Sequence, residues 1–201
     1  KCVKVYNDLQ IKLIPNKQSA SGVEPSSAEQ KLCLDALMDP KVLVMCIQGP
    51  SGSGKTLLSI SAALEQTIGP KPVFNKILLC KPVVPVDNDI GFLPGSEKDK
   101  LMPLMHSFFD NLEHISKEQD GLKFYNALNT QNKIDILPTY SIRGRSITNT
   151  FIIVDECQNL TSHAMKTIVS RVGEGTKIVL LGDPTQIDTA KLDVNNNGLT
   201  Y

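Results

Sequence analysis

Short apolar segments alternate with longer segments of helical periodicity from residue 41 onward. The apolar segments are residues 42–48, 76–81, 134–139, 151–155 and 177–182, and the helical candidates are residues 55–67, 97–112, 122–128 and 162–172. Strands that alternate with helices predict βαβ units, and near-continuous apolar runs predict strands buried on both faces of a parallel sheet. The expected fold class is therefore α/β, with ligands bound beyond the carboxyl ends of the strands.

The first forty residues carry a different pattern. Apolar and polar positions alternate over residues 3–13 around Asn7-Asp8, which predicts a short N-terminal β-hairpin. Residues 14–26 contain two prolines, a glycine and several serines and predict a linker. Ser27 precedes a segment of helical periodicity that extends to about Met38, which predicts a helix with Ser27 at its N-terminus.

Composition and charge limit the classes of protein that fit. The chain has 201 residues, 41% hydrophobic and 21% charged, so one ordinary globular domain is expected. Its formal net charge is zero, so any nucleic-acid partner must meet a local patch. The longest apolar run, residues 42–47, is far too short to span a bilayer, so no membrane partner is expected. Five cysteines without a CxxC pair favour a reducing, cytoplasmic location, and three scattered histidines argue against zinc.

One segment matches the phosphate-binding pattern GxxxxGK[ST] at every fixed position. Its residues are Gly49, Pro50, Ser51, Gly52, Ser53, Gly54, Lys55 and Thr56. Glycines let successive backbone N–H groups point inward as an anion nest, and the following helix adds its positive N-terminal end. Lys55 is expected to reach the β- and γ-phosphates, and Thr56 to hold Mg²⁺ through its hydroxyl. A glycine turn before a helix is the alternative, but the full pattern arises by chance in roughly one chain in a hundred of this length.

Two carboxylates follow the apolar run at residues 151–154. Asp155 is expected to hold Mg²⁺ through water, and Glu156 to orient or deprotonate the attacking water. An acidic turn at a strand end is a common alternative, and the phosphate loop favours the functional interpretation. After the last apolar run, Gln186 lies close to Gly182-Asp183, where a neutral amide can contact the γ-phosphate. On spacing alone, a turn with an incidental glutamine is favoured there.

Two of the three arginines, Arg143 and Arg145, share one tripeptide. Arginine is a preferred residue at phosphate-binding sites because its planar guanidinium binds two oxygens at once. These residues are candidates for nucleic-acid phosphate or for the γ-phosphate of a neighbouring subunit, and solvated loop charges are the alternative. Aromatic residues make up only 5% of the chain, so base stacking is not expected to be a major term. Phe92 is the one stacking candidate considered, and a core position is the simpler interpretation.

Several motifs in a fixed order resemble the PhoH-like family of ATPases, whose core is similar to that of superfamily 1 helicases. The motifs are residues 49–56, 81–86, 91–95, 143–146, 155–159 and 182–188. The resemblance covers roughly residues 22–201, so we expect a hairpin and linker over residues 1–21 and one ATPase domain over residues 22–201. It implies a three-layer α/β/α RecA-like core that binds ATP and Mg²⁺.

The resemblance also implies individual roles. Gln30 corresponds to the glutamine that contacts adenine, Gln186 to the γ-phosphate sensor, and the end of the strand at Lys81 to the edge that faces nucleic acid. Lys55, Glu156, Gln186 and Arg145 are therefore the expected catalytic residues, with Arg143 in the nucleotide-binding set. Cys157 stands where alanine is usual, and both side chains are small.

Residues 143–150, Leu160-Thr161 and residues 198–201 most resemble the branch of the family that is fused to an upstream PIN nuclease domain. That branch implies a homo-oligomeric ring, such as a hexamer, that acts on single-stranded RNA. The nuclease's acidic cluster is absent from the sequence, and the distal motif that carries an arginine near the γ-phosphate is not found. We therefore expect a fragment of a longer protein that binds ATP well and hydrolyses it slowly when monomeric.

Three functions are compatible with these motifs. The favoured one is Mg²⁺-dependent ATP hydrolysis coupled to RNA binding or unwinding. A small-molecule kinase would require an arginine-rich lid, and the chain has only three arginines. A nucleotide-dependent assembly switch without motor activity is the remaining alternative, and stimulation of ATP hydrolysis by RNA distinguishes it from the first.

Overall fold

The computed structural model describes residues 3–5, 11–15, 18–83, 101–117 and 120–200. Its centre is a five-stranded sheet made of β3 (Val44–Gln48), β7 (Lys177–Gly182), β6 (Thr150–Val154), β4 (Lys76–Lys81) and β5 (Ile134–Pro138), in that spatial order. Every neighbouring pair is parallel, which confirms the predicted α/β class. The strand β7 lies between β3 and β6, so the phosphate loop and the acidic pair follow strands that are not neighbours.

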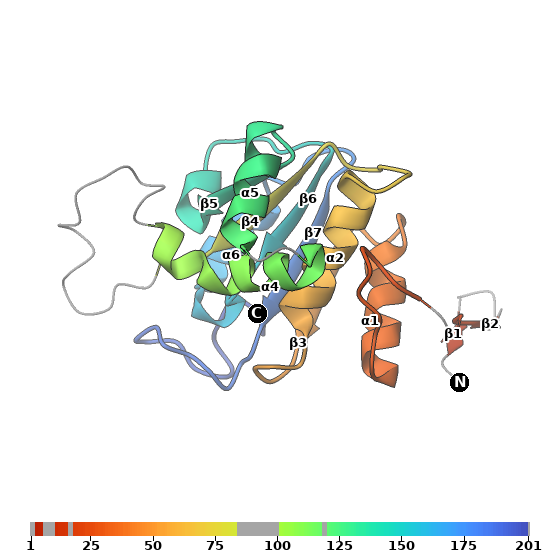
Figure 1. The fold of residues 1–201 in the computed structure, drawn as a ribbon. Helices are drawn as coiled ribbons and strands as arrows, with labels where there is room; N and C mark the ends of the chain where they lie inside the picture. The colour runs from red at the N-terminus through yellow and green to blue at the C-terminus, as the bar shows by residue number, and fades with distance from the viewer. Residues whose placement is uncertain (1–2, 6–10, 16–17, 84–100, 118–119, 201) are drawn as a thin grey trace.

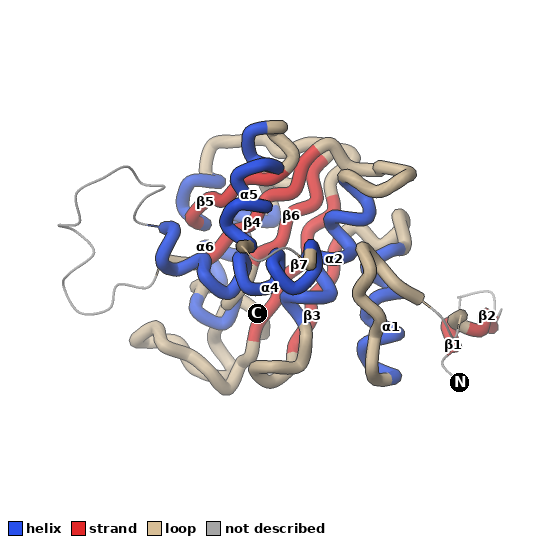
Figure 2. The backbone as a smooth tube through the Cα atoms, in the orientation of Figure 1, coloured by secondary structure: helices blue, strands red, loops and turns tan. Residues whose placement is uncertain are grey.

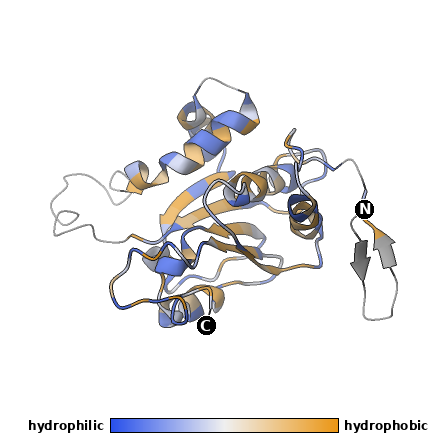
Figure 3. Cartoon of the chain, turned by 90° about the horizontal axis from the view of Figure 1, so that it is seen from below, coloured by the Kyte–Doolittle hydropathy of each residue, from blue (hydrophilic) through white to orange (hydrophobic). Residues whose placement is uncertain are grey.

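Helices cover both faces of the sheet (Figures 1 and 2). One face carries α1 (Ala28–Met38), α2 (Lys55–Thr67), α4 (His106–Ser116) and α5 (Gly121–Thr130), and the other carries α6 (Ser162–Val169). Side chains alternate along each strand, so Phe151 and Ile153 join the core beneath α2 and α4, whereas Ile152 and Val154 join the core beneath α6. In Figure 3 the central strands are mostly hydrophobic and the helices carry both hydrophobic and hydrophilic residues. The predicted three-layer α/β/α architecture is confirmed.

The two edge strands, β3 and β5, depart from their prediction, since alternate residues of β5 are only partly buried. The sequence predicts residues 42–48 as a strand buried on both faces, but β3 is exposed at alternate residues. Val44 is 57% exposed. The reason is topological: β3 is an edge strand, and the core beneath α6 contains residues from β4, β6 and β7 but none from β3. An apolar run alone does not distinguish an edge strand from a central one.

The helices begin and end close to their predicted positions. Ser27 caps α1 by accepting a hydrogen bond from the backbone N–H of Gln30, as its position in the sequence predicts. Of the predicted helix over residues 97–112, residues 97–100 lie outside the described residues, a 3₁₀ helix η2 spans Met102–Met105, and α4 continues to Ser116. Helix α6 ends at Val169, three residues before the predicted end.

A buried lysine fastens α1 to the sheet. Lys177 Nζ, at the start of β7, donates to the carbonyls of Ala36, Leu37 and Asp39 at the C-terminal end of α1, with 3.3 Å to Ala36 and 2.9 Å to Asp39. The same ammonium lies 5.8 Å from the centre of the Phe151 ring. A cation at this end of a helix satisfies carbonyls that have no partner within the helix and complements its dipole.

The N-terminal hairpin is present as predicted. The strands β1 (Val3–Val5) and β2 (Ile11–Leu13) pair antiparallel with Val3 opposite Leu13. The proposed turn at Asn7-Asp8 lies outside the described residues, as does Phe92. Within the described parts of the chain, no helix is long and apolar enough to cross a membrane.

Candidate nucleotide-binding site

The phosphate loop joins the carboxyl end of β3 to the first residue of α2. Its first residue is tied to the sheet, because the Gly49 N–H donates to the Gly182 carbonyl at 3.3 Å. Gly54 has a φ of 82°, in the left-handed region, and a Cβ atom there would lie 3.0 Å from Nε2 of Gln30. The backbone conformation therefore favours glycine at position 54, and the amide of Gln30 would have to shift to admit a Cβ atom there.

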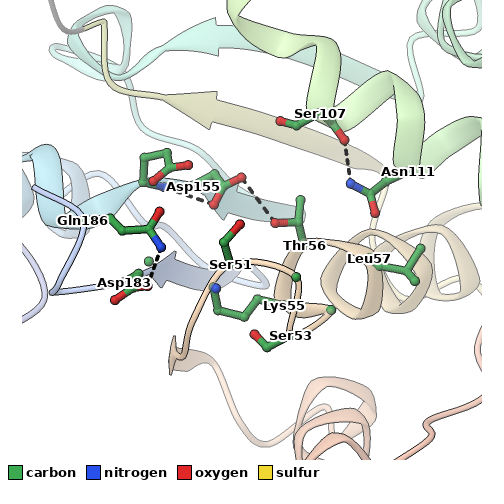
Figure 4. Close-up of a pocket in the computed structure, with 14 residues that line it drawn as sticks. Ser51, Ser53, Lys55, Thr56, Leu57, Ser107, Asn111, Asp155, Asp183 and Gln186 are labelled. Carbon is green, nitrogen blue, oxygen red and sulfur yellow. Dashed lines mark hydrogen bonds between the residues drawn. The ribbon is translucent and has the colours of Figure 1, made fainter. Parts of the chain in front are cut away.

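Lys55 bends back over the loop (Figure 4). Its Nζ donates to the carbonyls of Gly49 at 2.6 Å and Pro50 at 2.8 Å. Together these bonds hold a positive charge against the loop that the sequence predicts to cradle phosphate. The same ammonium is the only cation among the described residues that line a cavity of about 350 Å³ in front of the loop.

Thr56 and Asp155 meet across this cavity although they are far apart in the sequence. The Thr56 hydroxyl donates to Oδ2 of Asp155 at 3.3 Å. Burial raises the pKa of Asp155, the charge of Glu156 adds to the rise, and Lys81, the backbone N–H of Glu156 and the Thr56 hydroxyl oppose it. A cation beside this buried carboxylate would favour its ionised form.

The oxygen atoms of Thr56 and Asp155 fit a magnesium ion. Among the described residues no group of three histidine, cysteine, aspartate or glutamate side chains is placed to hold a metal alone. Mg²⁺ keeps several waters and is commonly bound through one or two carboxylates together with substrate phosphates. The hydroxyl and the carboxylate, beside a loop suited to phosphate, match that mode of binding.

Glu156, the second residue after the buried strand β6, has an unusual backbone conformation. Its φ is 55° and its ψ is 39°, which places a non-glycine residue in the left-handed region. Its Oε2 accepts a hydrogen bond of 2.5 Å from Gln158 Nε2, and its Oε1 lies 4.0 Å from Lys81 Nζ. A strained residue of this kind persists only where surrounding contacts hold its conformation. Residues of this kind are concentrated at functional sites.

Gln158 is a site residue for which the sequence analysis gives no role. Its buried amide donates to Glu156 and to the Gln186 carbonyl at 2.9 Å, and its Oε1 accepts from the Asp183 N–H at 3.2 Å. A Cβ atom at Gly182 would lie 2.3 Å from that Oε1, so the glycine makes room for the amide. A glycine that ends an otherwise apolar strand is the signal that could have pointed to a close neighbour there.

Asp183 positions Gln186 at the edge of the cavity. Gln186 Nε2 donates to Asp183 Oδ2 at 2.8 Å, and both residues line the cavity. The hydroxyl and the backbone N–H of Thr185 lower the pKa of Asp183. The structure thus brings Gln186 beside Lys55, Thr56, Asp155 and Glu156, as the sequence analysis expects.

Helix α4 contributes two further residues that the sequence analysis does not identify. Ser107 and Asn111 line the same cavity from the side opposite the loop, and Asn111 Nδ2 donates to the Ser107 carbonyl. They lie four residues apart, on one face of a helix whose Phe108, Phe109 and Leu112 are buried. A polar pair at this spacing on an amphipathic helix is the signal that sequence analysis could have used.

Gln30 lies on the other side of the loop. It lines a second cavity of about 590 Å³, together with Cys33 and residues of β3. Its Nε2 donates to the Ser53 carbonyl at 3.1 Å, and its Oε1 accepts from the N–H and the hydroxyl of Ser26. In this structure the amide of Gln30 therefore binds protein groups beside the loop, next to a space where a base could enter.

The two arginines of the tripeptide lie outside the cavity around the loop. Arg143 lines a cavity with Tyr140 and His163, and Arg145 lines another with Lys76 and Asp135. Both side chains belong to exposed residues. Within one chain, the structure does not bring either arginine to the residues that surround Lys55.

The chain is similar in sequence to several PhoH proteins. The chain is 42% identical over 192 residues to protein PhoH2 of Bacillus subtilis, covering 94% of the chain and 43% of that relative. It is 32% identical over 184 residues to protein PhoH2 of Mycolicibacterium smegmatis and 35% identical over 166 residues to a PhoH-like protein of Mycobacterium tuberculosis. These alignments cover 91% and 83% of the chain, but 41% and 45% of the relatives.

The chain thus spans less than half the length of these curated relatives. The sequence profile of the PhoH-like protein family matches residues 22–201, which include every residue of the cavity described above. The chain belongs to the PhoH-like protein family.

Proposed function

We propose that this chain binds ATP together with Mg²⁺ and hydrolyses the bond between the β- and γ-phosphates. The observation that carries the proposal is the approach of Thr56 to Asp155, 3.3 Å apart, in front of a complete phosphate loop. Gln30 and the apolar side of the second cavity would receive the adenine, and the N–H groups of residues 49–56 would surround the phosphates.

Each side chain of the cavity has a defined task in the proposed reaction. Lys55 exchanges its loop carbonyls for β- and γ-phosphate oxygens, and Glu156 accepts a proton from the water that attacks the γ-phosphorus. The bond from phosphorus to the bridging oxygen breaks, and ADP and phosphate leave. Bound through Thr56 and Asp155, Mg²⁺ would neutralise charge on the phosphate oxygens. Gln186 is placed to contact the γ-phosphate or the water.

Coupling to single-stranded RNA is the second part of the proposal. Its support is the resemblance of the core to superfamily 1 helicases and the position of Lys81, at the carboxyl end of β4 and 4.0 Å from Glu156. A contact between RNA and this lysine would change the surroundings of the proposed catalytic base. We also propose that residues 22–201 form one ATPase domain, that the longer protein carries an upstream PIN nuclease domain, and that it assembles into a ring.

The decisive experiment is phosphate release from ATP with and without single-stranded RNA, with EDTA added in a parallel reaction. We expect turnover that EDTA abolishes and RNA increases. Lys55→Ala should weaken nucleotide binding and remove hydrolysis, because the triphosphate loses the one cation among the described residues that line the cavity. Unchanged turnover in a folded Lys55→Ala variant would contradict the proposal. A nucleotide-dependent change in assembly without any response to RNA would instead favour the assembly switch.

A further inference from the structure

A small cavity lies beyond the carboxyl end of β5, on the same edge of the sheet as the phosphate loop. It is formed between η3 (Thr139–Ile142), which follows β5 directly, and the first two turns of α6. Tyr140, Arg143 and His163 line it, together with Thr139 and Thr167. None of the described residues that line this cavity is acidic.

Three of the side chains that line this cavity are exposed. Tyr140 is 56% exposed, and within the described parts of the chain it is the only aromatic side chain among the large exposed hydrophobic ones. Arg143 and His163 are also exposed. An exposed aromatic side chain beside an arginine offers a base a surface on which to stack and offers its phosphate a planar, bidentate partner.

The size of the cavity limits what it can hold. Its volume is about 230 Å³. Pockets that enclose drug-sized ligands are commonly about 300–1,000 Å³, so this one suits a single unit of a polymer rather than a whole cofactor. Phosphorylated peptides are commonly recognised by clusters of arginines, and only one arginine lines this cavity.

We propose that Tyr140, Arg143 and His163 form a site for one unpaired base of single-stranded RNA and its adjacent phosphate. Tyr140 stacks on the base, Arg143 binds the phosphate, and His163 and the two threonine hydroxyls donate or accept hydrogen bonds at the base or the ribose. This proposal rests on the proposed coupling to RNA and assigns Arg143 to RNA rather than to ATP.

The order of the strands connects this site to ATP hydrolysis. The strand β4 lies between β5 and β6, so Lys81 at its carboxyl end lies between the Tyr140 site and Glu156. An RNA strand that leaves the Tyr140 site along this edge reaches Lys81, whose Nζ is 4.0 Å from Glu156 Oε1. Occupation of the Tyr140 site would therefore direct the backbone of the RNA toward the partner of the catalytic base.

Fluorescence anisotropy with a labelled oligouridine of about 12 nucleotides tests the site, because single-strand sites span about 4–16 nucleotides. We expect Tyr140→Ala to weaken binding about 5- to 150-fold, as the loss of one stacked base predicts, and Tyr140→Phe to bind nearly as well as the unaltered chain. Arg143→Ala should make the negative slope of log K against log salt shallower by about 0.7, the value for one phosphate of a single strand. Lys123→Ala, which removes an exposed charge on α5, should leave that slope unchanged.

A second measurement uses the unaltered chain, so its result does not depend on whether the variants fold. Cross-linking to 4-thiouridine RNA followed by trypsin should label the peptide of residues 134–143, which contains Tyr140. Equal RNA affinity of Tyr140→Ala and Tyr140→Phe, with labelling elsewhere, overturns the proposed site while coupling to RNA stands. If the unaltered chain hydrolyses ATP but binds no RNA, both the site and the coupling are wrong.

Discussion

Glu156 shows how much of the site depends on single side chains. Its left-handed backbone costs about 1–2 kcal/mol relative to an ordinary conformation. Gln158 donates a hydrogen bond to one carboxylate oxygen of Glu156, and Lys81 Nζ lies 4.0 Å from the other. The orientation of the Glu156 side chain is therefore set by neighbours from η4 (Cys157–Asn159) and β4. A base that must meet one water molecule in one geometry benefits from being held in this way.

Replacing Glu156 by glutamine tests its role as the base. We expect Glu156→Gln to retain ATP binding and to slow hydrolysis roughly 10²- to 10⁴-fold, because the amide cannot accept the proton of the water. Binding of a fluorescent ATP analogue and single-turnover phosphate release measure the two effects separately. A large loss of nucleotide affinity would instead make Glu156 a structural residue or a metal ligand.

Replacing Gln158 tests whether the buried amide positions Glu156. In Gln158→Met the side chain keeps its length but loses its hydrogen bonds to Glu156, Gln186 and Asp183. We expect kcat to fall while KM for ATP changes little, together with a loss of about 1–3 kcal/mol in the free energy of unfolding. If kcat per folded molecule stays constant across the two variants Gln158→Met and Gln158→Ala, the amide is only structural.

Local sequence predicts some site residues and not others, and the reason is distance along the chain. Lys55 and Thr56 belong to a contiguous motif, and Asp155 directly follows a strand, so pattern alone places them. The role of Gln158 becomes visible only when β7 lies beside β6, which brings Asp183 and Gln186 to its amide. The placement of Arg143 away from the cavity also depends on the path of the chain after β5.

At the scale of elements, α1 is held at both ends. Gln30, near its N-terminus, donates to the phosphate loop at Ser53, and Lys177 binds the carbonyls at its C-terminus. The helix therefore links the second cavity to the start of β7. Nothing in the local sequence around Lys177 predicts this contact, because a lysine at the start of a strand is ordinarily exposed.

Removing the buried ammonium tests this link. Lys177→Met keeps most of the aliphatic length but removes the ammonium from the carbonyls of Ala36, Leu37 and Asp39. Leu37 then keeps its bond from Gln66, and Ala36 its bond from the Asp39 N–H. We expect the free energy of unfolding, measured with urea, to fall by about 2 kcal/mol or more. Lys123→Met, at a side chain that is 81% exposed, is the matched control and should change stability by less than about 0.5 kcal/mol. Equal stability of the two variants would show that Lys177 contributes little.

The sequence predicts where each strand begins and ends better than it predicts the place of the strand in the sheet and its burial. Four of the five parallel strands lie within one residue of the predicted segments, because an apolar run bounded by polar residues marks a strand wherever it lies in the sheet. The edge position of β3 is set by the insertion of β7 next to it, a pairing between segments more than a hundred residues apart. The exposure of Val44 is therefore a property of the topology and not of its own segment.

At the scale of the whole molecule, the cavity around the phosphate loop is short of positive charge. Among the described residues that line it, Lys55 is the only cation, and three carboxylates, Asp155, Glu156 and Asp183, line it as well. An arginine that contacts the transferred phosphate contributes roughly 10³–10⁵ in rate to enzymes of this kind. Since Arg145 lies at a different cavity of the same chain, a second copy of the chain is the source we predict.

Mixing two inactive variants tests this prediction. Arg145→Ala removes the arginine and Glu156→Gln removes the base, so each homogeneous preparation should hydrolyse ATP slowly. In a mixed assembly, a chain with intact Glu156 can lie next to a chain with intact Arg145, and some sites then contain both groups. We expect the mixture to exceed the sum of its parts, and the specific activity of the unaltered chain to rise with protein concentration. Rapid turnover that is independent of concentration and unaffected by Arg145→Ala would place every catalytic group within one chain.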